Sequence, residues 1–222
     1  MIKNIGILAY DGVEAMDYQG PLAIFDLLAS DAQGPKPIIV SQKKEFTCSN
    51  GRKFQADKTF SCEDSYDLII IPGGKGVFDF ASSNETKIFF DTQYKPDLYL
   101  FSICTGSFVL DELKLIGVGD TITTHWEFIH RPLKSGAKMV SSPFEVSKKY
   151  NRIWTSGGIF SGIDSSLIFI EQHYHALGTA QNSAEVVRTV GQYFPVTSHI
   201  SPKTQAQLNA PCYLFGTTSI CN

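Results

Sequence analysis

The sequence predicts an α/β fold built on a largely parallel central sheet. Short apolar runs, typical of strands that are buried on both faces, alternate along the chain with segments of helical periodicity. Glycine-rich or potentially reactive segments follow directly on several of these runs, as they do at the carboxyl edge of a parallel sheet. At 222 residues, 43% of them hydrophobic, the chain can form one domain with a large core.

The first part of the chain predicts two strands, one helix and one hairpin. Residues 5–9 form a continuous apolar strand, and residues 21–29 carry apolar side chains at helical spacing, with Pro21 suited to a first helical turn. Residues 38–41 predict the second strand. Residues 45–57 predict a β-hairpin, because Ser-Asn-Gly interrupts two strand-like runs.

The middle of the chain repeats the strand–helix alternation. Residues 67–71 (Asp-Leu-Ile-Ile-Ile) are the clearest buried strand, and residues 87–94 predict a helix. A further buried strand over 98–103 leads straight to Cys104, and residues 105–115 are again helical in pattern. Strand and helix therefore meet at this cysteine.

The last part predicts a second hairpin over residues 144–154, followed by helices over 159–175 and 182–193. Residues after 195 show little periodicity. We therefore expect one domain over residues 1–195 and an irregular tail over 196–222.

Bulk properties exclude several functions. A net charge of −3 and a pI of about 5.9 argue against a nucleic-acid or membrane-surface partner recruited by charge. No apolar stretch approaches the roughly 20 residues that span a bilayer. The N-terminus is typical of a strand rather than a signal peptide, so we expect a cytoplasmic protein.

The cysteines do not form a disulfide framework or a zinc site. Their number is odd, their spacing is irregular and no Cys-x-x-Cys pair occurs. In a reducing compartment they are free thiols. The cysteines are Cys48, Cys62, Cys104, Cys212 and Cys221.

Cys104 is the candidate nucleophile. The run Ser102-Ile103-Cys104-Thr105-Gly106 has the layout of a nucleophile elbow, in which a sharp strand-to-helix turn exposes the side chain. A helix N-terminus favours the thiolate form, so we expect a lowered pKa. The alternative is an inert core cysteine, and the strand–turn–helix context favours the reactive one.

Two other segments lie at predicted strand ends. Backbone N–H groups of Gly73 and Gly74, joined by that of Thr105, could form an oxyanion hole, although a tight turn alone also explains the two glycines. Asp17 precedes a predicted helix. It is either an N-terminal cap or dipole partner of that helix, or a carboxyl that exchanges a proton with Cys104 and has a raised pKa.

Several motifs together resemble the PfpI-like family of the class I glutamine amidotransferase-like superfamily. They are Pro72-Gly73-Gly74, the cysteine elbow, Thr124-His125-Trp126, and residues 155–159 with 162–164. The resemblance covers about residues 3–190. It implies a flavodoxin-like three-layer sandwich, with a mainly parallel central sheet, helices on both faces, and usually a homodimer.

Within this family, the motifs are most similar to isonitrile hydratases and to the sensor domains of AraC-type regulators. Resemblance to the hydratases implies a small-molecule substrate and no cofactor, with Cys104 as nucleophile, Asp17 as acid–base residue and the Thr105 hydroxyl near the sulfur. Peptidase-like members have histidine where Thr105 stands, which argues against peptidase activity. Members that act on glyoxals generally have glutamate where Asp17 stands, so the aspartate also argues against that activity.

Three further residues are secondary candidates. His125 is either a distant base or a structural histidine, Gly158 follows the late hairpin, and Asp164 is expected to cap or pack the following helix. His173 and His175 are two apart on a predicted helix and face different directions, so we expect no metal site.

Three functions stay open on the sequence alone. The first is a cofactor-free hydratase acting through a Cys104 thioimidate. The second is a non-enzymatic sensor in which Cys104 is oxidised or a ligand binds. The third is the same pocket acting on another electrophile, such as a nitrile or a carbonyl.

Overall fold

The computed structural model describes residues 2–147, 151–174 and 183–193. Met1–Gly191 form one compact unit, separate from the residues that follow. The fold described below is that of this unit. The predicted tail, the predicted boundary at residue 195 and part of the turn in the second hairpin lie outside the described residues.

The central sheet is parallel apart from one edge strand. Its order is β10-β11-β7-β6-β1-β2-β5, and only β10 pairs antiparallel, with β11. This confirms the predicted fold class. The strands are β1 (Ile5–Ala9), β2 (Pro37–Ser41), β5 (Lys58–Thr59), β6 (Leu68–Ile71), β7 (Tyr99–Ile103), β10 (Phe144–Val146) and β11 (Ile153–Ser156).

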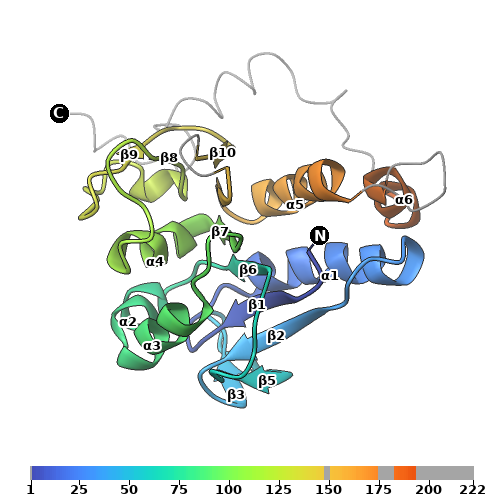
Figure 1. Cartoon of the computed structure of the whole chain (residues 1–222), viewed down its shortest axis with the longest axis horizontal. Coiled ribbons are helices and arrows are strands. Elements are labelled where there is room, and N and C mark those ends of the chain that lie inside the picture. The colour runs from blue at the N-terminus through green and yellow to red at the C-terminus, as the bar shows by residue number, and fades with distance from the viewer. Residues whose placement is uncertain (1, 148–150, 175–182, 194–222) are drawn as a thin grey trace. The chain divides into compact units, whose positions relative to one another are not determined.

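Helices cover both faces of this sheet, which gives the expected three layers (Figure 1). One layer consists of α1 (Ala15–Asp31), α5 (Phe160–His173) and α6 (Ser183–Val190), which pack against one another. The other consists of α2 (Val77–Ser82), α3 (Asn84–Gln93) and α4 (Ser107–Glu112). The inner strands β1 and β6 are buried along their whole length, as strands covered on both faces must be.

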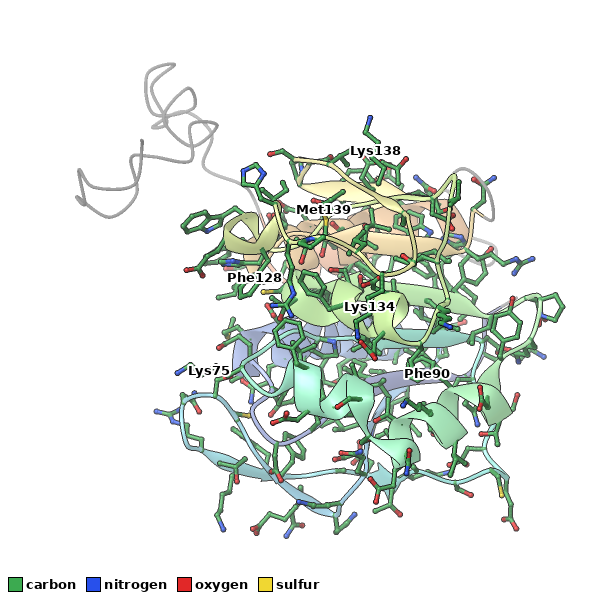
Figure 2. The ribbon with its side chains drawn as sticks, turned by 90° about the vertical axis from the view of Figure 1, so that its left-hand side faces the viewer. Lys75, Phe90, Phe128, Lys134, Lys138 and Met139 are labelled. Atoms are coloured by element: carbon green, nitrogen blue, oxygen red, sulfur yellow. The ribbon has the colours of Figure 1, made fainter. Side chains whose placement is uncertain are left out.

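Two small sheets flank the central one. β3 (Glu45–Thr47) and β4 (Lys53–Gln55) pair antiparallel, which confirms the predicted hairpin. β8 (Thr121–Ile122) and β9 (Lys138–Met139) pair in parallel and lie next to α4, on the side of that helix that faces away from α3 (Figures 1 and 2). The strands β5 and β9 and the helix α2 were not predicted, because elements this short carry no readable periodicity.

The first helix begins at Ala15, six residues earlier than predicted, so Pro21 lies in its interior. Burial of the early residues holds this extra turn in place: the Tyr18 ring packs edge-on against Phe46 and Phe54, with centroids 5.7 and 6.0 Å apart. Tertiary packing here outweighs the cost of an interior proline, about 3 kcal/mol.

The predicted helix over 105–115 is shorter than expected. A 3₁₀ turn over Cys104–Gly106 precedes α4, which ends at Glu112. Lys114 then adopts a positive φ of 56°, which α-helical geometry does not allow.

An aromatic cluster fixes the strands that lead to the predicted nucleophile. Phe169 of α5 stacks on Phe101 of β7 with centroids 6.0 Å apart and meets Trp154 of β11 edge-on at 5.0 Å. His173 stacks on Phe169 at 4.2 Å, so this histidine belongs to the core packing. The cluster holds the neighbouring strands β7 and β11 against α5.

Candidate functional site

Cys104 lies at a strained turn directly after β7. Its φ is 57°, a left-handed conformation that is uncommon for a residue other than glycine. Its N–H donates to the Gly157 carbonyl (3.2 Å) and its carbonyl accepts from the Thr124 hydroxyl (3.0 Å). A Cβ on Gly106 would lie 2.0 Å from the Ile71 carbonyl oxygen, so only glycine fits at this position. The predicted elbow is confirmed.

Asp17 lies in the first turn of α1, and its side chain is fully buried. Its Oδ1 accepts the N–H of Ile159 at 3.0 Å. Ile159 precedes α5 and itself has a positive φ of 42°, which is strained for a β-branched residue. The Oδ2 atom has no aligned hydrogen-bond partner among the described residues, although the Cys104 thiol interacts with this carboxyl.

Burial raises the pKa of Asp17 to about 6, against the opposing effects of the Ile159 N–H and the Cys104 thiol. At pH 7 the carboxyl is therefore largely ionised, yet it protonates within one unit of neutrality. Of the two roles considered for Asp17, this environment fits proton exchange with Cys104. Asp17 does not cap α1, since it lies inside the helix, but its place in the first turn also suits the expected dipole partner.

The expected low pKa of Cys104 is wrong. Burial, followed by the charge of Asp17, raises the pKa of the thiol well above its usual range. The Thr105 N–H and hydroxyl favour the thiolate but do not offset these two effects. The helix N-terminus that should have lowered the pKa is a 3₁₀ turn followed by a six-residue helix. The resting site therefore holds a thiol beside a carboxylate.

Thr105 and the glycine pair support the sulfur. The Gly74 N–H donates to Thr105 Oγ1 at 3.0 Å, which leaves the hydroxyl hydrogen free to reach the Cys104 sulfur. The Gly73 N–H interacts with the Asp17 carboxyl, and the Thr105 N–H with the sulfur. In the resting site each of the three donors already has a partner, so the expected oxyanion hole stays a prediction.

The secondary candidates separate into two groups. A Cβ on Gly158 would lie 3.5 Å from Cys104 Sγ and 3.1 Å from His125 Cδ2, so Gly158 lies beside both the sulfur and the His125 ring. Burial lowers the pKa of His125, which keeps the ring neutral at pH 7. Asp164 is exposed on α5, whose N-cap is Ile159, so Asp164 does not cap this helix.

Three residues near Cys104 and Asp17 have roles that the sequence did not predict. The buried Tyr10 donates to the Pro72 carbonyl at 2.7 Å, and its pKa is raised by burial and by the charges of Asp17 and Cys104. Thr124 holds the elbow carbonyl and Ile159 holds Asp17. Thr124 and Ile159 lie within the motifs that carry the family resemblance, and Tyr10 directly follows β1, which could have indicated them.

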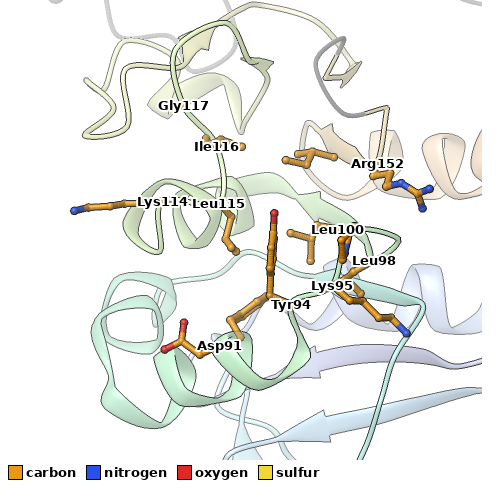
Figure 3. A pocket seen from close by; sticks show the side chains of 13 residues that line it. Asp91, Tyr94, Lys95, Leu98, Leu100, Lys114, Leu115, Ile116, Gly117 and Arg152 are labelled. Atoms are coloured by element: carbon orange, nitrogen blue, oxygen red, sulfur yellow. The ribbon is translucent and has the colours of Figure 1, made fainter.

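The cavity in Figure 3 lies elsewhere. It is an open pocket of about 490 Å³, lined by Leu98, Leu100 and Ile153, at the starts of β7 and β11, together with Tyr94 and Ile116. Cys104 follows the end of β7, so the cavity is at the opposite edge of the sheet. Among the described residues, no three acidic, cysteine or histidine side chains gather as metal ligands, and no helix is long and apolar enough to cross a bilayer.

Comparison with known proteins agrees with this architecture. The model of the DJ-1/PfpI family matches residues 3–172. An isonitrile hydratase from Pseudomonas putida is 32% identical over 181 residues, which cover 82% of this chain and 76% of that protein.

Solved structures share the fold at low identity. A ThiJ/PfpI family protein from Pseudomonas syringae superposes with a TM-score of 0.74 at 24% identity, covering 94% of this chain and 86% of that one. Oxidized DJ-1 from Toxoplasma gondii gives 0.69 at 21% identity, with coverage of 87% and 99%. The family match and the overall architecture lead to one conclusion: this chain belongs to the DJ-1/PfpI family.

Proposed function

We propose that the protein is a cofactor-free hydratase that converts an isonitrile into an N-substituted formamide through a covalent Cys104 thioimidate. The observation that carries the proposal is the pairing of a buried thiol with a carboxyl of pKa about 6. The 32% identity to an isonitrile hydratase supports the choice of substrate.

The first half of the reaction needs a base beside the thiol. Near neutral pH, Asp17 is ionised and Cys104 is protonated, so the carboxylate takes the thiol proton as the sulfur attacks the terminal isonitrile carbon. The S–H bond breaks and an S–C bond forms. Asp17 then gives the same proton to that carbon, which leaves the thioimidate R–N=CH–S–Cys104.

The second half consumes one water molecule. Its oxygen bonds to the thioimidate carbon and a proton goes to nitrogen, with Asp17 carrying the proton between them. The carbon–sulfur bond then breaks, the hydroxyl becomes the formamide carbonyl, and its proton returns through Asp17 to the sulfur. The products are R–NH–CHO and free Cys104 thiol, so Asp17 is unchanged over the cycle.

Thr105 acts here directly on the reacting sulfur. Its hydroxyl accepts from Gly74 and faces the sulfur, where it stabilises negative charge as the S–H bond breaks. This preserves the Thr105 role that the resemblance implies.

The test is formamide production from a panel of isonitriles by the wild type and by Cys104→Ala. We expect turnover in the wild type only, and an intact-mass increase on Cys104 equal to the isonitrile when the reaction is quenched early. Because Asp17 must be ionised, kcat/KM should fall below pH 6. Formamide produced by Cys104→Ala at the wild-type rate contradicts the proposal.

The sensor function is less well supported. Oxidation requires thiolate character, and both burial and Asp17 act against the thiolate form of Cys104. Mild peroxide followed by intact-mass analysis separates the two functions, because a sensor gains oxygen on Cys104 and the hydratase keeps a thiol. The homodimer stays a prediction, which light scattering checks.

A further inference from the structure

The short segment that follows β6 links the start of α1 to the cysteine elbow. The Gly73 carbonyl accepts the Glu14 N–H at 2.8 Å, and the Gly74 N–H donates to Thr105 Oγ1 at 3.0 Å. These two bonds involve the carbonyl and the N–H of one peptide group, the group between Gly73 and Gly74. That peptide group is therefore fixed on both of its sides.

The preceding peptide group, between Pro72 and Gly73, is held by Tyr10. The Tyr10 hydroxyl donates to the Pro72 carbonyl at 2.7 Å in a buried hydrogen bond. The N–H of the same peptide group belongs to Gly73 and interacts with the Asp17 carboxyl. Because a trans peptide group is planar, its C=O and N–H point in opposite directions, so fixing the carbonyl also fixes the direction of the N–H.

Tyr10 is itself held firmly. It directly follows β1, which pairs with β6, and only 1% of its surface is exposed. Its ring stacks on that of Phe80 in α2, with centroids 4.2 Å and planes 14° apart. Gly73, in contrast, has no side chain to restrict rotation of the peptide group that precedes it. The Tyr10 hydroxyl therefore supplies the restriction that glycine lacks.

We propose that Tyr10 is a positioning residue for Asp17: its hydroxyl holds the Pro72–Gly73 peptide group so that the Gly73 N–H stays directed at the carboxylate. An N–H directed at a carboxylate favours the ionised form, which the proposed reaction needs. Without the hydroxyl, the buried Pro72 carbonyl loses this donor, and the peptide group can rotate towards another. The inference deepens the proposed function and rests on it for the catalytic consequence alone.

The first test uses the wild-type protein and does not depend on the folding of a variant at Tyr10. In ¹H–¹⁵N NMR spectra recorded from pH 4.5 to 8, the Gly73 amide should titrate with the midpoint of Asp17, about 6. The titration should be absent in Asp17→Asn. A Gly73 amide that does not titrate near this pH, or that titrates equally in Asp17→Asn, overturns the proposal.

The second test removes the hydroxyl and keeps the ring. Tyr10→Phe can still stack on Phe80, so it deletes only the hydrogen bond to Pro72. The Asp17 pKa is then followed by ¹³C NMR of the carboxyl carbon, which is assigned by its loss in Asp17→Asn. We expect this pKa to rise by about 0.5–1 unit, the effect of one N–H on a buried carboxylate. An unchanged or lowered pKa overturns the proposal.

Tyr66→Phe is the matched control. Tyr66 is also buried, at 3% exposed, and its ring lies 6.2 Å from that of Phe89. Its hydroxyl donates to Asp64 Oδ2 at 3.3 Å, near the start of β6, whereas Pro72 follows the end of that strand. The Asp17 pKa should equal that of the wild type. A rise as large as in Tyr10→Phe would mean that any lost tyrosine hydroxyl has this effect, and overturns the proposal.

Turnover separates the positioning role from a merely structural one. In Tyr10→Phe the acid limb of the kcat/KM profile should move to higher pH with the Asp17 pKa, so the rate below pH 6 falls about 3–10-fold while the rate at pH 8 stays close to that of the wild type. An equal loss at every pH overturns the proposal. If the wild type hydrates no isonitrile, the proposed function fails, while the NMR titrations still decide whether Tyr10 positions the N–H that faces Asp17.

Discussion

Two buried aspartates of this protein have opposite surroundings. Asp120, which is 1% exposed, accepts the Ser147 hydroxyl on Oδ1 and the Gly117 N–H at 2.8 Å on Oδ2. Asp17, which is 0% exposed, accepts the Ile159 N–H on Oδ1, and its Oδ2 has no aligned partner among the described residues. Asp120 ties a loop to the neighbouring strand, whereas Asp17 faces Cys104.

The difference separates a structural carboxyl from one suited to chemistry. Hydrogen bonds to both oxygens compensate a buried carboxylate for its lost hydration. A buried carboxylate whose second oxygen lacks an aligned hydrogen bond destabilises the fold, but that oxygen can accept a proton. The cost at Asp17 is visible as a pKa raised to about 6.

Replacing the two aspartates by asparagine should separate their roles most clearly in catalysis. Asp17→Asn removes the base and should lower the rate of formamide production by about 10²–10⁴-fold, the usual contribution of such a group. Asp120→Asn should keep the wild-type rate wherever it is folded. Equal rate losses in both variants would show that Asp17 is structural.

The free energy of unfolding should change in the reverse sense to the rate: Asp17→Asn should be stabilised and Asp120→Asn destabilised. With a folded pKa of about 6 against 3.8 for an unperturbed carboxyl, ionised Asp17 costs the fold about 3 kcal/mol. The cost is absent below pH 4, grows up to about pH 6 and is constant above it. Asp17→Asn, whose Oδ1 still accepts from Ile159, should gain stability over the wild type across this range.

Urea denaturation at pH 4.5 and 7.5 measures this difference, and comparison with the wild type cancels the other titrating groups. Asp120→Asn should instead be less stable at both pH values, by about 1–3 kcal/mol for the disturbed hydrogen bonds. An advantage of Asp17→Asn that does not grow with pH contradicts the assignment of the raised pKa.

The smallest expected effect concerns the thiol. The charge of Asp17 raises the pKa of Cys104, so Asp17→Asn should lower that pKa and raise the thiolate fraction. Alkylation by iodoacetamide at pH 7 should then be faster by about tenfold for each pKa unit by which the thiol pKa falls. The variant would be more reactive towards the reagent and less active as a hydratase. Slower alkylation in Asp17→Asn contradicts the pairing.

The sequence predicted what local patterns control. Residues 67–71 and 98–103 match β6 and β7 to within one residue, because strands buried on both faces are continuous apolar runs. The elbow at Cys104 followed from the strand, the turn and the glycine after it. The start of α1 did not, since Pro21 indicated a first turn and the burial of Tyr18 moved it.

The chemistry of the site depends on contacts that no local pattern contains. The pKa of Cys104 is set by its burial and by Asp17, which is far away in sequence. Asp17 is held by Ile159, 142 residues further along the chain. Composition gave no sign of this contact, and the predicted helix N-terminus suggested that the pKa of the thiol is lowered, whereas it is raised.

The backbone at the elbow also restricts how this protein can diverge. A φ of 57° at position 104 is accessible to serine, asparagine or aspartate but strains β-branched residues. Gly106 has no room for a Cβ. Descendants can therefore exchange the thiol for a hydroxyl or a carboxyl by point mutation, whereas a threonine nucleophile would first require the turn itself to be rebuilt.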